Sequence, residues 1–166
     1  MTTLSVEIKP QQQTGLVTTP ELKKYYDELR PVFCPYLNDQ IHFTPDGWYH
    51  LHHYVDRKPR SDRMIRVKIR LFRKYAVGTL RKAHTLQEHR ASLHPVGNAS
   101  RDGLHTTKLF QYFAFEDVDL RNRISYRIII RKIGDGQHHF WSIIPTWRVE
   151  TKNIPKSIGR IELEDE

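Results

Sequence analysis

The sequence is poor in several features that would place it in large protein classes. It contains a single cysteine, Cys34, which excludes an internal disulfide framework and fits a reducing cytoplasm. Because Cys34 stands between Phe33 and Pro35, we expect a small buried residue rather than a nucleophile. No apolar run has membrane-spanning length, and the first residues lack the charged-then-apolar pattern of a signal peptide. We therefore expect a cytoplasmic protein that has no membrane partner.

Motifs for several kinds of catalysis are also missing. The sequence has no glycine-rich phosphate loop, dinucleotide fingerprint or nucleophile elbow, which argues against nucleotide hydrolysis, redox and lipase-type chemistry. One segment is dense in metal-ligand types, His50 to His53 with Asp56, and in it His52 and Asp56 are four residues apart. Their spacing matches no standard closed zinc site, and the H-E-x-x-H motif is absent. We therefore expect neither a metal nor a cofactor, and a metal-dependent hydrolase ranks below a metal-free enzyme.

Acidic residues are fewer than basic ones, and this balance favours an anionic partner. The chain has 27 lysines and arginines against 19 aspartates and glutamates, which gives a formal net charge of +8. Such a chain attracts polyanions such as nucleic acid, although a merely soluble basic protein would show the same balance. Its 166 residues, 38% of them hydrophobic, suffice for one domain with its own core. We expect that domain at residues 19–149, between a flexible polar segment at 1–18 and a polar, acidic tail at 150–166.

Three helix starts can be recognised in the first half of the chain. Each has a capping threonine or serine followed by proline or aspartate, namely Thr19-Pro20, Thr44-Pro45 and Ser61-Asp62. The first helix should end before Pro31, and a short strand is predicted at 40–43. The third helix should run to about residue 82, with a weak point at Gly78.

The third predicted helix has an apolar stripe beside a basic one. The apolar side chains recur at helical spacing and should face the core; they are Ile65, Ile69, Phe72, Ala76 and Leu80. The basic stripe consists of Arg63, Arg66, Arg70 and Arg73. It is either a solvated face or a phosphate-binding wall, and the second alternative makes Arg63, Arg66 and Arg70 candidates for RNA binding.

From Lys108 onward the sequence is typical of β-strands. Residues rich in β-strand formers fill 109–115, 126–132 and 137–144, and Gly134-Asp135-Gly136 is a strong hairpin signal between the last two. The stretch 84–107 lacks clean periodicity, so we expect a long surface connection there with a short helix at about 86–91. Helices first and strands afterwards predict an α+β fold, with an antiparallel sheet covered on one face by the helices.

The last predicted hairpin carries polar side chains in stretches that otherwise resemble sheet core. Arg127 and Arg131 are four apart in one strand, so they share a face and are able to clamp a phosphate. In the partner strand, His139 and Ser142 have an odd separation, so both share a face only if a bulge intervenes. A two-residue turn would place Ser142 with the arginines, whereas a three-residue loop would place His139 and Trp141 there. We favour the second, which leaves Trp141 exposed for base stacking, with ordinary packing as an equal alternative.

Several of these segments together resemble a known superfamily of small ribonucleases. They are, in chain order, Phe33-Cys34-Pro35, Ile41-His42-Phe43-Thr44, Gly47-Trp48-Tyr49-His50-Leu51, an arginine-rich helix, Arg127-Ile128-Ile129-Ile130-Arg131 and His139-Phe140-Trp141-Ser142. This order resembles the barnase/EndoU/colicin/RelE-like superfamily, especially members carried by phages and mobile elements, over roughly residues 20–148. The resemblance implies N-terminal helices on one face of a four-stranded antiparallel sheet and RNA cleavage without a metal ion. It also implies RNA as substrate and, as in toxin-like members, a neutralising antitoxin or immunity protein.

Metal-free RNA cleavage requires a base for the ribose 2′-hydroxyl, an acid for the leaving 5′-oxygen and cations for the phosphate. His50 and His139 match the helix and last-strand motifs, so the resemblance makes them the acid and base, without assigning which is which. Arg127 and Arg131 would hold the phosphate, and Ser142 would donate a further hydrogen bond. We therefore predict a metal-independent, toxin-like endoribonuclease. The alternative is a non-catalytic RNA-binding or partner-binding module on the same fold, in which His50 is a structural group.

Overall fold

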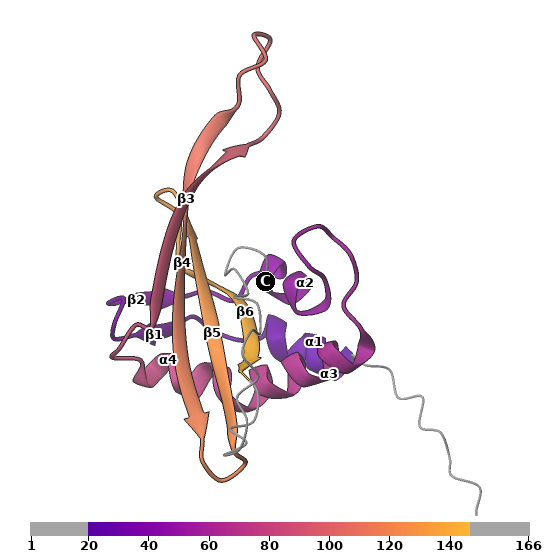
Figure 1. Cartoon of the computed structure of the whole chain (residues 1–166), viewed down its shortest axis with the longest axis vertical. Coiled ribbons are helices and arrows are strands. Elements are labelled where there is room, and N and C mark those ends of the chain that lie inside the picture. The colour runs from indigo at the N-terminus through magenta and orange to yellow at the C-terminus, as the bar shows by residue number, and fades with distance from the viewer. Residues whose placement is uncertain (1–19, 147–166) are drawn as a thin grey trace, which may run out of the picture.

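The computed structural model describes residues 20–146 and has an α+β fold (Figure 1). The helical elements are α1 (Pro20–Asp27), α2 (Pro45–His52), α3 (Asp62–Leu71), the π-helical turn η1 (Phe72–Ala76) and α4 (Val77–Lys82). The strands are β1 (Val32–Cys34), β2 (Asp39–Ile41), β3 (Glu88–Val96), β4 (Thr106–Asp119), β5 (Ile124–Ile133) and β6 (His139–Thr146). The predicted segments 1–18 and 150–166 lie outside the described residues. Within 20–146, no helix has the length and apolar character needed to cross a membrane.

The predicted helix starts are confirmed. Thr44 precedes Pro45 at the first position of α2, and Ser61 accepts a hydrogen bond from the Met64 amide at the start of α3. α1 begins at Pro20 and ends before Pro31. Ser61 therefore caps α3 as expected, whereas Thr44 makes no side-chain capping hydrogen bond at the start of α2.

Gly47 allows α2 to lie directly against β6. A Cβ atom at this position would overlap the carbonyl oxygen of Phe140 and lie 2.5 Å from the hydroxyl oxygen of Tyr26. That hydroxyl is itself held in place, because it donates to the Thr44 carbonyl oxygen at 2.9 Å. The glycine therefore weakens the helix by its propensity but sets how closely α2 approaches the sheet.

Replacing Gly47 with alanine is expected to destabilise the protein by about 2 kcal/mol or more, because the added methyl group would displace a backbone carbonyl. Gly78→Ala is the matched control, since an added Cβ atom there has no neighbour within 4 Å. Alanine at that exposed helical position should stabilise by up to about 1 kcal/mol. Urea unfolding of both variants measures the difference, and equal effects would contradict the close approach of α2.

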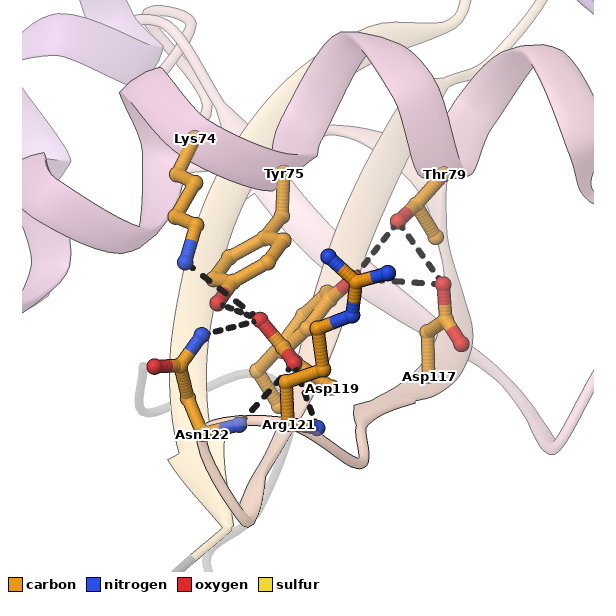
Figure 2. A network of polar contacts seen from close by, with 8 residues as sticks. Lys74, Tyr75, Thr79, Asp117, Asp119, Arg121 and Asn122 are labelled. Carbon is orange, nitrogen blue, oxygen red and sulfur yellow. Dashed lines mark hydrogen bonds and ion pairs between the residues drawn. The ribbon is translucent and has the colours of Figure 1, made fainter.

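The helix predicted from Ser61 to about residue 82 is divided into α3, η1 and α4. The π-helical turn η1 falls before the weak point predicted at Gly78. In this turn Tyr75 donates to the Asp119 carboxylate and stacks on Tyr126, with ring centroids 4.5 Å apart. Figure 2 shows the surrounding network, in which the labelled residues are Lys74, Tyr75, Thr79, Asp117, Asp119, Arg121 and Asn122. The hydrogen bonds to Asp119, first of all the one from Tyr75, lower the pKa of this carboxyl group. The network fixes the irregular turn to the end of β4.

The main sheet is four-stranded and antiparallel, as predicted, and its strand order is β3-β4-β5-β6. One face belongs to the principal core, which includes Tyr26, Phe72, Leu80, Phe115, Ile128, Phe140 and Ile143. A smaller apolar cluster contains Tyr112, Ala114, Ile129, Trp141 and Ile144. Helix α2 contacts this second cluster too, because the His50 ring lies on Trp141. The predicted packing of the helices on one face alone is therefore not confirmed.

The predicted surface connection at 84–107 is wrong, because β3 occupies much of it. Glu88 to Val96 pairs with Ala114 to Thr106, and the pairing of β4 with β5 reaches only to Phe110. The end of the β3–β4 hairpin is therefore two-stranded and projects beyond β5 and β6 (Figure 1). Residues along β3 alternate between half-buried and exposed, but both sets mix polar and apolar types, so the alternation is invisible in the sequence.

Candidate functional site

Several of the predicted site residues come together where α2 packs against β6. The segment before α2 is bound to this strand by its backbone: the His42 amide donates to the His138 carbonyl at 2.9 Å, and the Phe140 amide donates to the His42 carbonyl at 2.8 Å. Thr44-Pro45 then starts the helix, which carries His50 to the strand. Segments about 90 residues apart in the sequence thus meet at one place.

A β-bulge places His139 and Ser142 on the same side of β6. His139 lies opposite Arg131 and Ser142 lies opposite Ile129, while Trp141 is the extra residue between them. Residues 129 and 131 share one face of β5, so their partners share it too. The favoured register therefore holds for His139, and the bulge brings Ser142 to the same face.

Trp141 forms the centre of this cluster. The Arg131 guanidinium lies 3.5 Å from the centroid of the indole ring, and the His50 ring centroid lies 3.9 Å from it. The side chain is only 7% exposed, so the prediction of an exposed aromatic residue at this position is wrong. The cause is α2, which covers a part of β6 that the sequence pattern alone left open.

Arg131 and His139 are hydrogen-bonded to each other. Arg131 Nε donates to His139 Nε2 at 2.9 Å, and its Nη2 donates to Asp46 at 3.4 Å. Because a guanidinium has no acceptor, His139 Nε2 must carry a lone pair, and its Nδ1 proton faces the Gln137 carbonyl oxygen at 3.4 Å. Burial, and then the Arg131 charge, lower the pKa of His139 to about 4, so this imidazole is neutral at pH 7.

His50 is more deeply buried than His139 and has a different hydrogen-bonding state. It is 2% exposed, and neither ring nitrogen has a hydrogen-bond partner among residues 20–146. Burial, followed by the charges of Lys68, Arg60 and Arg131, lowers the pKa of His50 to about 2. Trp141 Nε1 is also buried without a partner in the described part of the chain. Nearly all buried polar groups in proteins are paired, so these atoms are exceptions, as are Thr44 Oγ1 and Arg127 Nε.

Ser142 has a cationic partner that the sequence reasoning missed. Lys68 of α3 is 1% exposed, and its Nζ donates to Ser142 Oγ at 2.8 Å. Lys68 lies three residues after Ile65 and four before Phe72, so it falls within the apolar stripe of its helix. A lysine in such a stripe is the signal that could have identified it, because buried lysines almost always have a specific partner.

Arg127 does not join the cluster as a phosphate ligand. Its two terminal nitrogens donate to Glu88 at 2.9 Å and to Glu116 at 3.2 Å. It shares a face of β5 with Arg131, as predicted, but its charge is balanced by two carboxylates. The two arginines of the predicted clamp therefore differ in their partners: Arg127 is paired with two carboxylates, whereas Arg131 is bonded to His139 and Asp46.

The metal-ligand types in the segment after His50 do not converge. His52 Nδ1 faces the Trp48 carbonyl oxygen at 2.8 Å, His53 Nδ1 faces that of Tyr49 at 3.2 Å, and Asp56 pairs with Lys58 at 2.8 Å. Throughout residues 20–146, no three histidine, cysteine or acidic side chains are arranged to hold a metal ion.

The predicted RNA-binding arginines lie apart from the cluster. Arg63, Arg66 and Arg70 are exposed on α3, whereas Lys68 of the same helix is directed to Ser142. At 100° per residue, the three arginines lie on the side of the helix opposite Lys68. A ligand on this face does not contact the buried cluster directly.

Comparison with known proteins leaves the chain without an assigned family. No family model matches it, and no curated protein or solved structure matches it. The resemblance to small ribonucleases therefore remains a prediction from the order and local pattern of the residues.

Proposed function

We propose that this protein is a metal-independent endoribonuclease of the barnase/EndoU/colicin/RelE-like type, toxin-like and acting in the cytoplasm. The observation that carries the proposal is the meeting of two imidazoles, a guanidinium, an ammonium and a hydroxyl beside the bulge of β6, where the nitrogens of His50 have no partner among the residues that the structure describes. These groups are His50, Lys68, Arg131, His139 and Ser142. A buried polar atom without a partner costs stability, which is expected where a site is built for a substrate.

The protonation states favour a different assignment of the acid and base roles from the predicted histidine pair. With pKa values of about 2 and 4, His50 and His139 are both neutral at pH 7, so neither supplies a proton readily. The lone pair of His139 is occupied by Arg131, which leaves His50 as the base, and the bound phosphate anion has to raise the pKa of His50 before it accepts the proton. Lys68, which donates to Ser142, is then the source of the proton for the leaving group.

The reaction follows from these roles. His50 takes the proton of the ribose 2′-hydroxyl, the 2′-oxygen forms a bond to phosphorus, and the bond from phosphorus to the 5′-oxygen breaks. A proton passes from Lys68 through Ser142 to the departing 5′-oxygen, while Arg131 stabilises the charge on the phosphoryl oxygens. The product is a 2′,3′-cyclic phosphate. Each group is less than one-tenth exposed, so RNA enters only when the contact between α2 and β6 opens.

The proposal is tested by incubating the purified full chain with cellular RNA in EDTA and analysing the fragment ends. Cyclic phosphate ends are expected, and His50→Leu should lower their rate of formation by roughly two to four powers of ten. His53→Leu, on the same helix, is the control and should retain full activity, because its ring faces a backbone carbonyl. RNA left intact by the wild-type protein across pH 5 to 8 would reject the enzyme.

A second candidate is a non-catalytic RNA-binding or partner-binding module. It is favoured by the closure of the cluster, since Arg131, His139 and Ser142 are buried and bonded to other side chains. Satisfied buried polar networks also occur as specificity devices in ordinary cores. RNA that binds without cleavage, or specific capture of an antitoxin or immunity protein without RNA binding, would support this alternative.

A further inference from the structure

The outer side of α3 and η1 carries an arginine face that consists of Arg63, Arg66, Arg70 and Arg73. All four are exposed, and their spacing of three and four residues places them along one side of the helix. Between residues 62 and 82 there are eight basic residues and one acid, Asp62. None of the four arginines forms an ion pair or hydrogen bond with another residue in the described part of the chain. The arginine face is therefore not an ordinary surface of alternating charges.

Several other arginines in the structure have protein partners. Arg127 is paired with two glutamates, Arg131 with His139 and Asp46, and Arg60 donates to the His50 carbonyl oxygen while lying 4.2 Å from the Tyr54 ring centroid. On the arginine face, by contrast, four like charges extend over about 15 Å of helix, at about 1.5 Å per residue. Such a row repels itself and is neutralised most effectively by a ligand that carries several negative charges in a line.

A hollow of about 460 Å³ lies within this face. It is lined by Leu22, Arg66, Ile69, Arg70, Arg73 and Lys74. The three arginines match the bidentate contacts that phosphates accept, whereas Lys74 is already paired with Asp119, and the two apolar side chains suit a sugar. The lining includes no aromatic or amide side chain, so it offers nothing for stacking on a base or for reading its edge.

We infer that the arginine face binds the sugar-phosphate backbone of RNA without regard to sequence. That the polyanion is RNA rests on the proposed function. That the ligand is an anionic chain rests on the four arginines, which have no partner within residues 20–146, and on the hollow beside them. The face lies on the far side of α3 from Lys68, so backbone binding and cleavage are separable properties. RNA is held on the outer side of the helix while a neighbouring nucleotide reaches the cluster.

The test measures binding of RNA that resists cleavage. Fluorescence anisotropy with labelled 2′-O-methyl RNA, which lacks the attacking hydroxyl, reports binding alone, with the salt concentration varied. Arg66→Ala/Arg70→Ala should weaken binding about tenfold and make the salt slope shallower by about 1.4, since each phosphate contact on a single strand contributes about 0.7. Arg101→Ala/Arg121→Ala removes the same charge from exposed turns and should change binding far less.

Each outcome decides the inference. Equal losses in the two double variants would overturn it, because net charge alone would then explain binding. Displacement of the RNA by polyglutamate at equal charge concentration would overturn it in favour of an acidic protein. Cleavage of ordinary RNA with unchanged binding in Arg66→Ala/Arg70→Ala would overturn the inferred role of the arginine face but would not affect the proposed ribonuclease activity. Arginine-dependent binding without cleavage would uphold the face and reject the enzyme.

Discussion

The free energy of unfolding is expected to fall steeply as the pH is lowered from about 6.5 to 4. The folded protein holds two neutral, buried imidazoles, since burial first of all lowers the pKa of His139 to about 4 and that of His50 to about 2. In the unfolded chain both titrate near 6.5. Below that value the unfolded state binds more protons than the folded state, so the stability present above pH 6.5 is lost as the pH falls.

The expected loss is large compared with the stability of a small domain. Each pH unit below 6.5 costs about 1.4 kcal/mol per depressed histidine, so at pH 5 the two together remove about 4 kcal/mol. A typical domain has only about 5–15 kcal/mol in total. The carboxyl groups of Asp39 and Asp119 have pKa values below their ordinary range, so their contributions are lost only below about pH 4. The window between pH 4 and 6.5 therefore isolates the histidines, and His52, whose pKa burial also lowers, adds to the loss.

Urea unfolding at a series of pH values measures this loss, and His50→Leu provides the sharpest comparison. Leucine has a similar volume and needs no hydrogen bond, so this variant should be at least as stable as the wild type at pH 7 and should lose less stability at pH 5. His89→Leu, on exposed β3, is the matched control and should keep the wild-type pH dependence. Equal slopes for the wild type and His50→Leu would show that the buried imidazole does not have a depressed pKa.

The resemblance to small ribonucleases singled out His50, and local reasoning from the sequence placed α2, α3 and the hairpin of β5 and β6 correctly. Capping residues and the glycine-rich turn act over a few residues, so their signals can be read directly. Sequence reasoning did not foresee that Gly47 lets α2 lie against Phe140, which buries both His50 and Trp141.

The features that the sequence did not reveal depend on contacts between distant elements. The bulge at Trp141 changes the face of Ser142, and no residue pattern in β6 announces it. Arg127 is neutralised by Glu88 of β3, a strand whose mixed side chains gave no periodic signal. Lys68 could have been recognised as a lysine within an apolar stripe, but a single polar residue there does not indicate which partner it will bind.

Replacing Lys68 with methionine is expected to lower RNA cleavage by roughly two to four powers of ten, the usual effect of removing a general acid. The fold should survive, because exchanging a buried charge for an apolar side chain of similar length is often neutral for stability. Far-ultraviolet circular dichroism and urea unfolding establish the fold, and Lys82→Met, at the exposed end of α4, serves as the control. Full activity in a folded Lys68→Met variant would exclude Lys68 from the reaction.

A substrate with a better leaving group separates the two proton transfers. A nucleoside 3′-(4-nitrophenyl phosphate) releases a phenolate that needs no proton, so a general acid contributes little to its cleavage. Lys68→Met should therefore cleave this substrate at nearly the wild-type rate, whereas His50→Leu should remain slow, because the 2′-hydroxyl still has to lose its proton. If both variants were equally slow on the aryl ester, Lys68 would be acting on the phosphate charge beside Arg131, and the proton for the 5′-oxygen would have to come from another group.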